Sequence, residues 1–211
     1  MRCLAVATCL SVALLMGAGP LDPPTIGLDN YLKKADDTTS LSVKSTADTP
    51  LGKVVKFSFT SQTWQGHKWT HSLGVVIPKE IKYPDAMLLF ITGGGIGGEL
   101  RDGDLMLAFG LARMCGARVA ILPQVPNQPL LGGKSEDTLI AETFVRFLET
   151  KDADWPLLFP MVKSAVKAMD VLQDWAKKEG AAVERFVVTG ASKRGWTTWL
   201  TGASDPRVKA I

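Results

Sequence analysis

One stretch near the end of this 211-residue chain, Val183 to Trp196, constrains the fold more than any other. Phe186 to Thr189 are apolar or β-branched and predict a short buried strand. Gly190 and Gly195 then bracket a tight turn with Ser192 at its tip, and a helix is expected to follow. A strand, a sharp turn and a helix in direct succession indicate a fold that alternates strands and helices.

The turn has the chemical features of a nucleophile elbow, the serine-bearing turn of α/β-hydrolases. A serine on such a turn projects its hydroxyl above the sheet, and small neighbours let the helix approach the strand. The backbone N–H of Lys193, at the start of the helix, can then stabilise an oxyanion. The motif is irregular, because the second glycine comes three residues after Ser192 and Arg194 takes its usual place. The alternative is a glycine-lined turn with a surface serine.

A second glycine-rich turn, Gly93 to Gly98, follows the continuous apolar strand expected at residues 87–92. Its backbone N–H groups near Gly94 and Gly95 are candidate oxyanion donors that face the nucleophile. Two other interpretations stay open, a plain glycine turn and a dinucleotide-binding G-x-G-x-x-G within the same run. Dinucleotide binding requires an acid after the next strand, where this chain reads Leu122-Pro123-Gln124, and we therefore expect no cofactor.

The remaining pattern predicts an α/β fold, with a mainly parallel sheet and helices on both faces. Ser135 is expected to cap a helix whose apolar positions Ile140, Phe144, Phe147 and Leu148 recur at helical spacing. Further helices are expected at residues 28–34, 105–114 and 160–178, and further strands at 54–60, 73–77, 118–122 and from about 208. Residues 61–71 predict a hairpin region and residues 36–50 a polar loop.

The amino terminus predicts export. Arg2 precedes an apolar run that ends in Gly17-Ala18-Gly19, the pattern of a secretory signal peptide cleaved near Ala18 or Gly19. An uncleaved anchor is the alternative. We therefore divide the chain into a signal peptide (1–19), a linker and amino-terminal extension (20–50) and an α/β-hydrolase-like region (51–211). The mature protein is expected to be secreted or periplasmic, with no membrane span after signal cleavage.

Composition narrows the partners. The chain is 46% hydrophobic and 21% charged with a formal net charge of +3, an ordinary globular balance that gives no case for nucleic-acid binding. His67 and His71 are four residues apart in the hairpin region, with no acid or cysteine cluster nearby, so we expect no metal site there. Cys115 is expected to be a buried small hydrophobe. The sequence does not indicate an oligomeric state.

A serine nucleophile needs a base and an acid, which α/β-hydrolases supply later in the chain. Only nineteen residues follow Ser192, and none is a histidine. The downstream acid, Asp205, lies in Asp205-Pro206-Arg207, which is typical of a turn. We therefore expect a carboxy-terminally truncated, incomplete hydrolase-like domain whose acid and histidine lie beyond the end of this chain. By itself it is expected to be inactive and to aggregate.

Several stretches match a known family. They are Thr60 to Trp64, Trp69 to His71, Ile91 to Gly95, Leu139 to Thr150, Trp155 to Leu158, Pro160 to Asp170, Thr189 to Leu200 and Asp205 to Val208. With them the chain resembles the PhoPQ-activated pathogenicity-related family, which also includes the autocrine proliferation repressor proteins. The resemblance implies an exported, α/β-hydrolase-like protein with Ser192 in the nucleophile's place. The elbow alone is also similar to that of glucuronoyl esterases, which makes Arg194 a candidate contact to substrate or oxyanion.

Two functions follow from these features. The first is an exported serine hydrolase of esterase or peptidase type, which would act on a small-molecule, peptide or glycan ester. The second is a non-catalytic secreted binding or signalling protein on the same scaffold, because fold alone does not determine activity. The presence or absence of a downstream acid and histidine discriminates between them.

Overall fold

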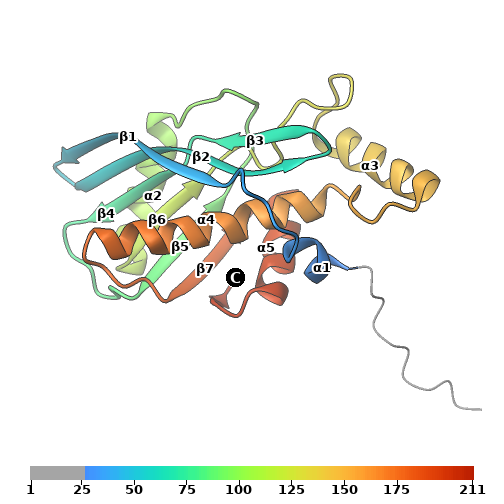
Figure 1. Ribbon diagram of the computed structural model, residues 1–211. Coiled ribbons are helices and arrows are strands. Elements are labelled where there is room, and N and C mark those ends of the chain that lie inside the picture. The colour runs from blue at the N-terminus through green and yellow to red at the C-terminus, as the bar shows by residue number, and fades with distance from the viewer. Residues whose placement is uncertain (1–26) are drawn as a thin grey trace, which may run out of the picture.

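The computed structural model describes residues 27–211, and within them eight strands form one sheet (Figure 1). The strand order is β1-β2-β4-β6-β5-β7-β8, and β3 pairs with β2. The strands are β1 (Ser40–Thr49), β2 (Gly52–Trp64), β3 (His67–His71), β4 (Gly74–Pro78), β5 (Ala86–Ile91), β6 (Arg118–Leu122), β7 (Arg185–Gly190) and β8 (Val208–Ala210). The helices are α1 (Leu28–Leu32), α2 (Asp102–Cys115), α3 (Glu136–Thr150), α4 (Leu158–Lys178) and α5 (Lys193–Ser204).

The sheet has an antiparallel half and a parallel half. Strand β2 pairs antiparallel with β1, β3 and β4, and β4 is also antiparallel to β6. Strands β6, β5, β7 and β8 are parallel. Ile91 and Gly190, the last residues of β5 and β7, are register partners. The loops that follow these two central strands therefore begin side by side at the carboxyl edge of the sheet, where ligands bind in open α/β folds.

Side-chain alternation along the strands builds one core on each face of the sheet. On β5, Met87, Leu89 and Ile91 belong to the larger core, which also contains most of the buried residues of α4. Leu88 and Phe90 point to the opposite face, where α2 supplies the covering residues. Figure 1 shows α4 in front of the sheet and α2 behind it. The predicted α/β fold class with helices on both faces is confirmed. The sheet is not mainly parallel as expected, because β1 to β4 add an antiparallel half to the parallel strands.

One predicted loop is a strand. Residues 36–50 were expected to form a polar loop, but Ser40–Thr49 form β1 and pair with β2 across nine residue pairs, with a bulge at Val43 to Ser45. Almost every residue of β1 is exposed. Leu41 packs against the core, but the apolar alternation stops after Val43 and is too short to predict a strand. The backbone ladder to β2 holds it in place, as is usual for a polar edge strand.

The predicted burial of Cys115 is also wrong. Cys115 is exposed, because it lies in the last turn of α2, whose buried residues are Ala108, Phe109 and Ala112. Helix α3 buries Leu139 and Thr143, whereas Phe144 is 37% and Leu148 61% exposed. The predicted helix is confirmed, but part of its apolar face does not contact the core.

The other predicted helices and strands are present in the structure, with bounds that differ by at most a few residues. The end of α2 is set by Gly116, which adopts the left-handed conformation (φ 64°) and donates its N–H to Ala112 O. No helix within residues 27–211 is long and apolar enough to cross a membrane. The expected signal peptide, residues 1–19, lies outside the described residues.

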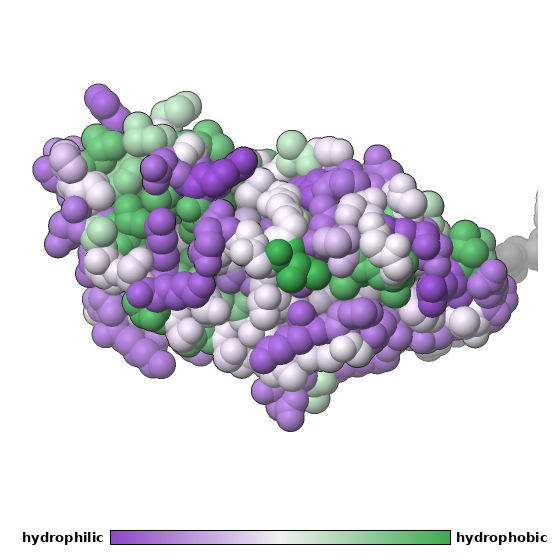
Figure 2. Space-filling model, turned by 90° about the horizontal axis from the view of Figure 1, so that it is seen from above, coloured by the Kyte–Doolittle hydropathy of each residue, from purple (hydrophilic) through white to green (hydrophobic). Residues whose placement is uncertain are grey.

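Figure 2 shows polar residues over much of the upper face and apolar residues gathered toward one end of it.

Candidate active site

Ser192 occupies a strained turn between β7 and α5. Its backbone has φ 58° and ψ −128°, a combination that non-glycine residues rarely adopt. The residue is exposed, and α5 begins at the next position, Lys193. A strained serine between a buried strand and a helix is the geometry that presents a nucleophilic hydroxyl above a sheet. Because α5 begins directly after the serine, the backbone N–H of Lys193 is the first donor of the helix.

Two glycines allow the turn to be this tight. A Cβ on Gly190 would lie 2.9 Å from both C and O of Arg194, which is too close for unbonded atoms. A Cβ on Gly195 would lie 3.2 Å from Gly190 O. Strand β7 and helix α5 therefore approach each other at the positions where neither residue has a side chain. Gly195 contacts the strand even though it comes one position later than in the usual motif.

The glycine-rich loop after β5 lies against the elbow. A Cβ on Gly93 would lie 2.6 Å from Arg194 Nη2, so the missing side chain leaves the space that the guanidinium fills. Gly94 has φ 137°, which side chains rarely adopt, and Ile96 N–H donates to Gln128 O (2.7 Å). The two glycine turns identified in the sequence are thus neighbours in space, joined through Arg194.

Arg194 is buried, 9% exposed, and links three parts of the site. Its Nε donates to Val125 O (2.5 Å), while Nη1 and Nη2 donate to the two carboxylate oxygens of Glu136 (2.8 and 2.7 Å). This paired geometry is the strong form of an arginine–carboxylate interaction. The sequence suggested Arg194 as a contact to substrate or oxyanion. In the structure each of its three side-chain nitrogens donates to an oxygen of the protein.

Glu136 is the site residue that the sequence did not reveal. Besides Arg194, it pairs with Lys193 Nζ (2.6 Å) and accepts from Gln128 Nε2. Hydrogen bonds from Arg194, then from Lys193 and Gln128, outweigh burial and hold the pKa of the Glu136 carboxyl far below its usual range. Its N–H is satisfied by Gln128 Oε1 (2.8 Å), and Ser135, at the helix-capping position, makes no side-chain capping bond. In the sequence, Glu136 could only be read as an acid that favours the helix dipole.

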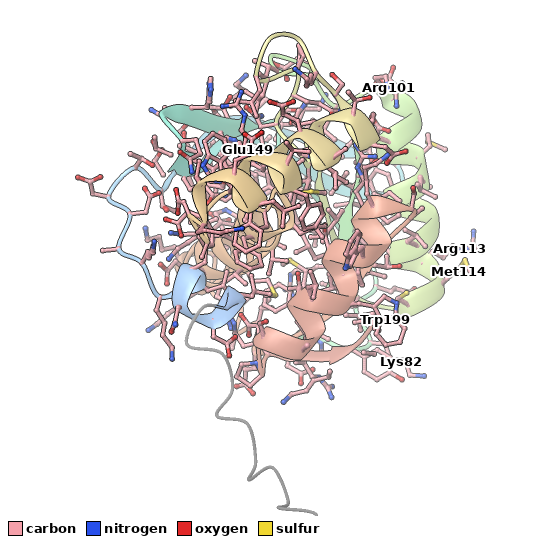
Figure 3. The ribbon with its side chains drawn as sticks, turned by 90° about the vertical axis from the view of Figure 1, so that its right-hand side faces the viewer. Lys82, Arg101, Arg113, Met114, Glu149 and Trp199 are labelled. Carbon is pink, nitrogen blue, oxygen red and sulfur yellow. The ribbon has the colours of Figure 1, made fainter. Side chains whose placement is uncertain are left out.

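A pocket of about 460 Å³ opens beside the serine, between α3 and α5. Ser192, Lys193 and Trp196 line it from the elbow side. Helix α3 contributes four residues spaced at one helical face, namely Asp137, Ile140, Ala141 and Phe144. Figure 3 shows α3 crossing near the start of α5, with Trp199 farther along α5 on the same side as Met114 of α2.

His71 is a buried structural residue. Its Nδ1 lies 2.8 Å from Pro123 O, which can only accept, so Nδ1 carries the proton. Nε2 must then accept from the Ser61 hydroxyl (2.9 Å), which is also 3.0 Å from Ser164 Oγ. This network fixes the start of the loop after β6. Burial lowers the pKa of His71 to about 4, and the bond to Pro123 opposes this only partly.

The buried His71 predicts a pH dependence of stability. The folded-state pKa lies below the unfolded value of about 6.5, so the unfolded chain binds more protons between those values. The contribution is complete above pH 6.5 and is lost as pH falls toward 4. We expect it to total about 3 kcal/mol of unfolding free energy. Urea titrations at several pH values from 7 to 4 measure how the free energy of unfolding changes with pH. This pH dependence should be weaker in His71→Gln, whereas the control His67→Gln should retain it. An equal pH dependence of the unfolding free energy in His71→Gln and in the unmodified protein would contradict the lowered pKa of His71.

The remaining candidates have structural partners. Asp205 is buried and accepts from Arg207 Nε and Nη2 (3.0 and 2.6 Å), as expected for a turn residue. Burial raises the pKa of the Asp205 carboxyl, but the bonds and charge of Arg207 prevail and hold it below its usual value. Within residues 27–211, no group of three or more histidine, cysteine or acidic side chains could hold a metal ion.

Two sequence comparisons bear on the family of this chain. The sequence profile of the family described as PhoPQ-activated pathogenicity-related protein matches residues 28–211. Autocrine proliferation repressor protein A of Dictyostelium discoideum is 34% identical over 196 residues, which cover 87% of this chain and 40% of that protein. The chain therefore spans well under half the length of this relative.

Solved structures with the same fold include esterases. A candidate acetyl xylan esterase from Bacteroides fragilis aligns with a TM-score of 0.56 at 18% identity, over 86% of this chain and 49% of the other. Acetyl xylan esterase 1 from Thermoanaerobacterium aligns with a TM-score of 0.53 at 19% identity, over 86% of this chain and 55% of the other. At these identities the likeness shows the α/β-hydrolase fold alone. On the extent of the profile match and the identity to its relative, the chain belongs to the PhoPQ-activated pathogenicity-related protein family.

Proposed function

We propose that this chain carries the nucleophile elbow of an exported serine hydrolase of the esterase type, with Ser192 as the nucleophile. The observation that supports it most is the backbone of Ser192, strained at φ 58° and ψ −128° on an exposed turn. Strain of this kind persists where the surrounding structure enforces it, and it concentrates at functional sites. The adjoining pocket and the esterase neighbours point the same way.

In the proposed reaction, Ser192 Oγ attacks the carbonyl carbon of an ester while its proton passes to a general base. The carbonyl oxygen becomes an oxyanion, for which the backbone N–H groups of Lys193, Gly94 and Gly95 are the proposed donors. The alcohol then leaves with a proton from the base, and water releases the acyl group by the reverse sequence. In this proposal the ion pair of Glu136 and Arg194 keeps the elbow next to the Gly93 loop, because the Arg194 guanidinium packs against Gly93.

The base is proposed to come from sequence outside residues 27–211. His71 is buried with both ring nitrogens engaged, and His67, at the start of β3, follows the β2–β3 turn. Asp205 is held by Arg207. A longer form of the protein, which adds the acid and the histidine, is consistent with a relative of which this chain covers 40%. A small-molecule or glycan ester is the proposed substrate class, by analogy with the esterase neighbours.

Labelling with a fluorophosphonate probe tests the proposal. The 211-residue chain should not label, because an isolated serine hydroxyl lacks a base to accept its proton. The longer form should label, and Ser192→Ala should remove the label. A longer form that stays unlabelled while folded would favour the second candidate, a binding or signalling protein on the hydrolase scaffold. Labelling that survives Ser192→Ala would reject Ser192 as the nucleophile.

A further inference from the structure

The pocket beside Ser192 has apolar walls on both sides. Ile140, Ala141 and Phe144 face it from α3, and Trp196 faces it from α5. Phe144 is 37% and Trp196 47% exposed, and both line this one pocket, so they form an exposed aromatic surface beside the serine. A concave site that joins exposed aromatic residues to a reactive polar group is the common form of a small-molecule pocket.

The charges around the pocket cancel one another. Lys193 and Arg194, which flank the serine, would by themselves attract an anion. In the structure Lys193 pairs with Glu136 (2.6 Å) and Asp137 (2.9 Å), while Arg194 pairs with Glu136 (2.7 Å). The positive charges of Lys193 and Arg194 are thus balanced by the carboxylates of Glu136 and Asp137. A ligand with its own negative charge would lose hydration on the apolar wall without gaining an unpaired cation in return.

We propose that this pocket binds an uncharged apolar group of the ester substrate, one larger than an acetyl group. Its volume of about 460 Å³ is at the smaller end of the range for small-molecule sites. That volume suits a phenyl ring or a short alkyl chain placed against Phe144 and Trp196. The inference rests on the proposed function, because it takes the reacting carbonyl to lie at Ser192. It assigns the specificity of the site to α3, the helix that Glu136 fastens to the elbow.

Ligand binding tests the pocket separately from catalysis. The probe is butyl phenyl ketone, an uncharged ketone that resembles an aryl ester, and its matched analogue carries a carboxylate on the ring. Binding is followed by ¹⁹F NMR on the longer form labelled with 5-fluorotryptophan, with the Trp196 and Trp199 signals assigned by Trp196→Phe and Trp199→Phe. We expect the ketone to shift the Trp196 signal and leave the Trp199 signal unchanged. The carboxylate analogue should bind about tenfold more weakly.

Two matched variants locate the site on α3. Phe144→Ala should raise the dissociation constant about fivefold, because it removes apolar surface that the ligand covers. Val145→Ala, at an adjacent exposed position that does not line the pocket, should leave it unchanged. Far-ultraviolet circular dichroism of both variants shows whether α3 is intact. An unshifted Trp196 signal, equal effects of the two variants, or equal or tighter binding of the carboxylate analogue would overturn the inference.

The outcome is separable from that of the proposed function. A Trp196 shift with the expected selectivity, together with an unlabelled Ser192 in the longer form, would keep the apolar pocket and reject the hydrolase. A labelled Ser192 with an unshifted Trp196 signal would keep the hydrolase and reject the apolar pocket. Both proposals are supported only when Ser192 labels and the ketone is selected over its charged analogue.

Discussion

Replacing Ser192 by alanine in the longer form is expected to lower ester hydrolysis by a factor of about 10⁴ to 10⁶. In the proposed mechanism the hydroxyl forms the covalent intermediate, so its loss would leave only oxyanion stabilisation and binding. The fold should be unaffected, because the serine side chain makes no capping bond and the residue is exposed. Hydrolysis of an uncharged aryl butyrate, measured by release of the phenol, gives the ratio.

Ser45→Ala is the matched control for that experiment. Ser45 is an exposed serine on the polar edge strand β1, and it does not line the pocket beside Ser192. The control should keep the activity of the unmodified protein. A loss of less than about tenfold in Ser192→Ala would contradict the proposed mechanism, since such a residue would not form the covalent bond.

The second large effect is expected at Gly190. In Gly190→Ala the new Cβ would meet the backbone C and O of Arg194 at 2.9 Å, and backbone atoms cannot move aside as a flexible side chain can. The elbow would have to open, and we expect the free energy of unfolding to fall by about 3 kcal/mol. Chemical denaturation at pH 7 measures this. In the longer form the same variant should also lose Ser192 labelling, because the strained turn depends on this close approach.

Gly110→Ala is the control, and it is expected to leave the free energy of unfolding unchanged or to raise it slightly. Gly110 lies in α2, and a Cβ there would meet nothing within 4 Å. Alanine is the better helix former by about 1 kcal/mol, so this variant should be as stable as the unmodified protein or slightly more stable. Gly190→Ala and Gly110→Ala with equal stability would contradict the close packing of β7 against α5.

The sequence predicted most strands and helices because their residues carry a clear burial pattern. Strand β5 is a continuous apolar run and Arg118–Leu122 was located to the residue, since both are covered on two faces. Strand β1 was missed for the opposite reason: it is a polar edge strand that pairing alone holds in place. Cys115 was misplaced because an apolar helical stretch does not reveal which of its end residues point outward.

The candidate site was predicted in part. The two glycine turns were identified locally, because each follows an apolar strand and has a composition that only a tight turn requires. Their contact through Arg194 and Gly93 depends on the parallel register of β5 and β7, which no local pattern encodes. Glu136 lies 58 residues from Arg194 in the sequence, so their ion pair could not be inferred from spacing. The exposure of Phe144 on α3 could not be predicted, because helical spacing alone does not distinguish a core-facing side of a helix from an exposed one.

The measurement that tests the central claim most directly is the identity of the residue that carries the covalent label. Trypsin should release Phe186 to Lys193 as one peptide, in which Ser192 is the single serine and Thr189 the single threonine. Fragmentation of this peptide from the fluorophosphonate-treated longer form should place the added mass on Ser192. An adduct on any other residue, with the Ser192 peptide unmodified, would contradict the nucleophile assignment.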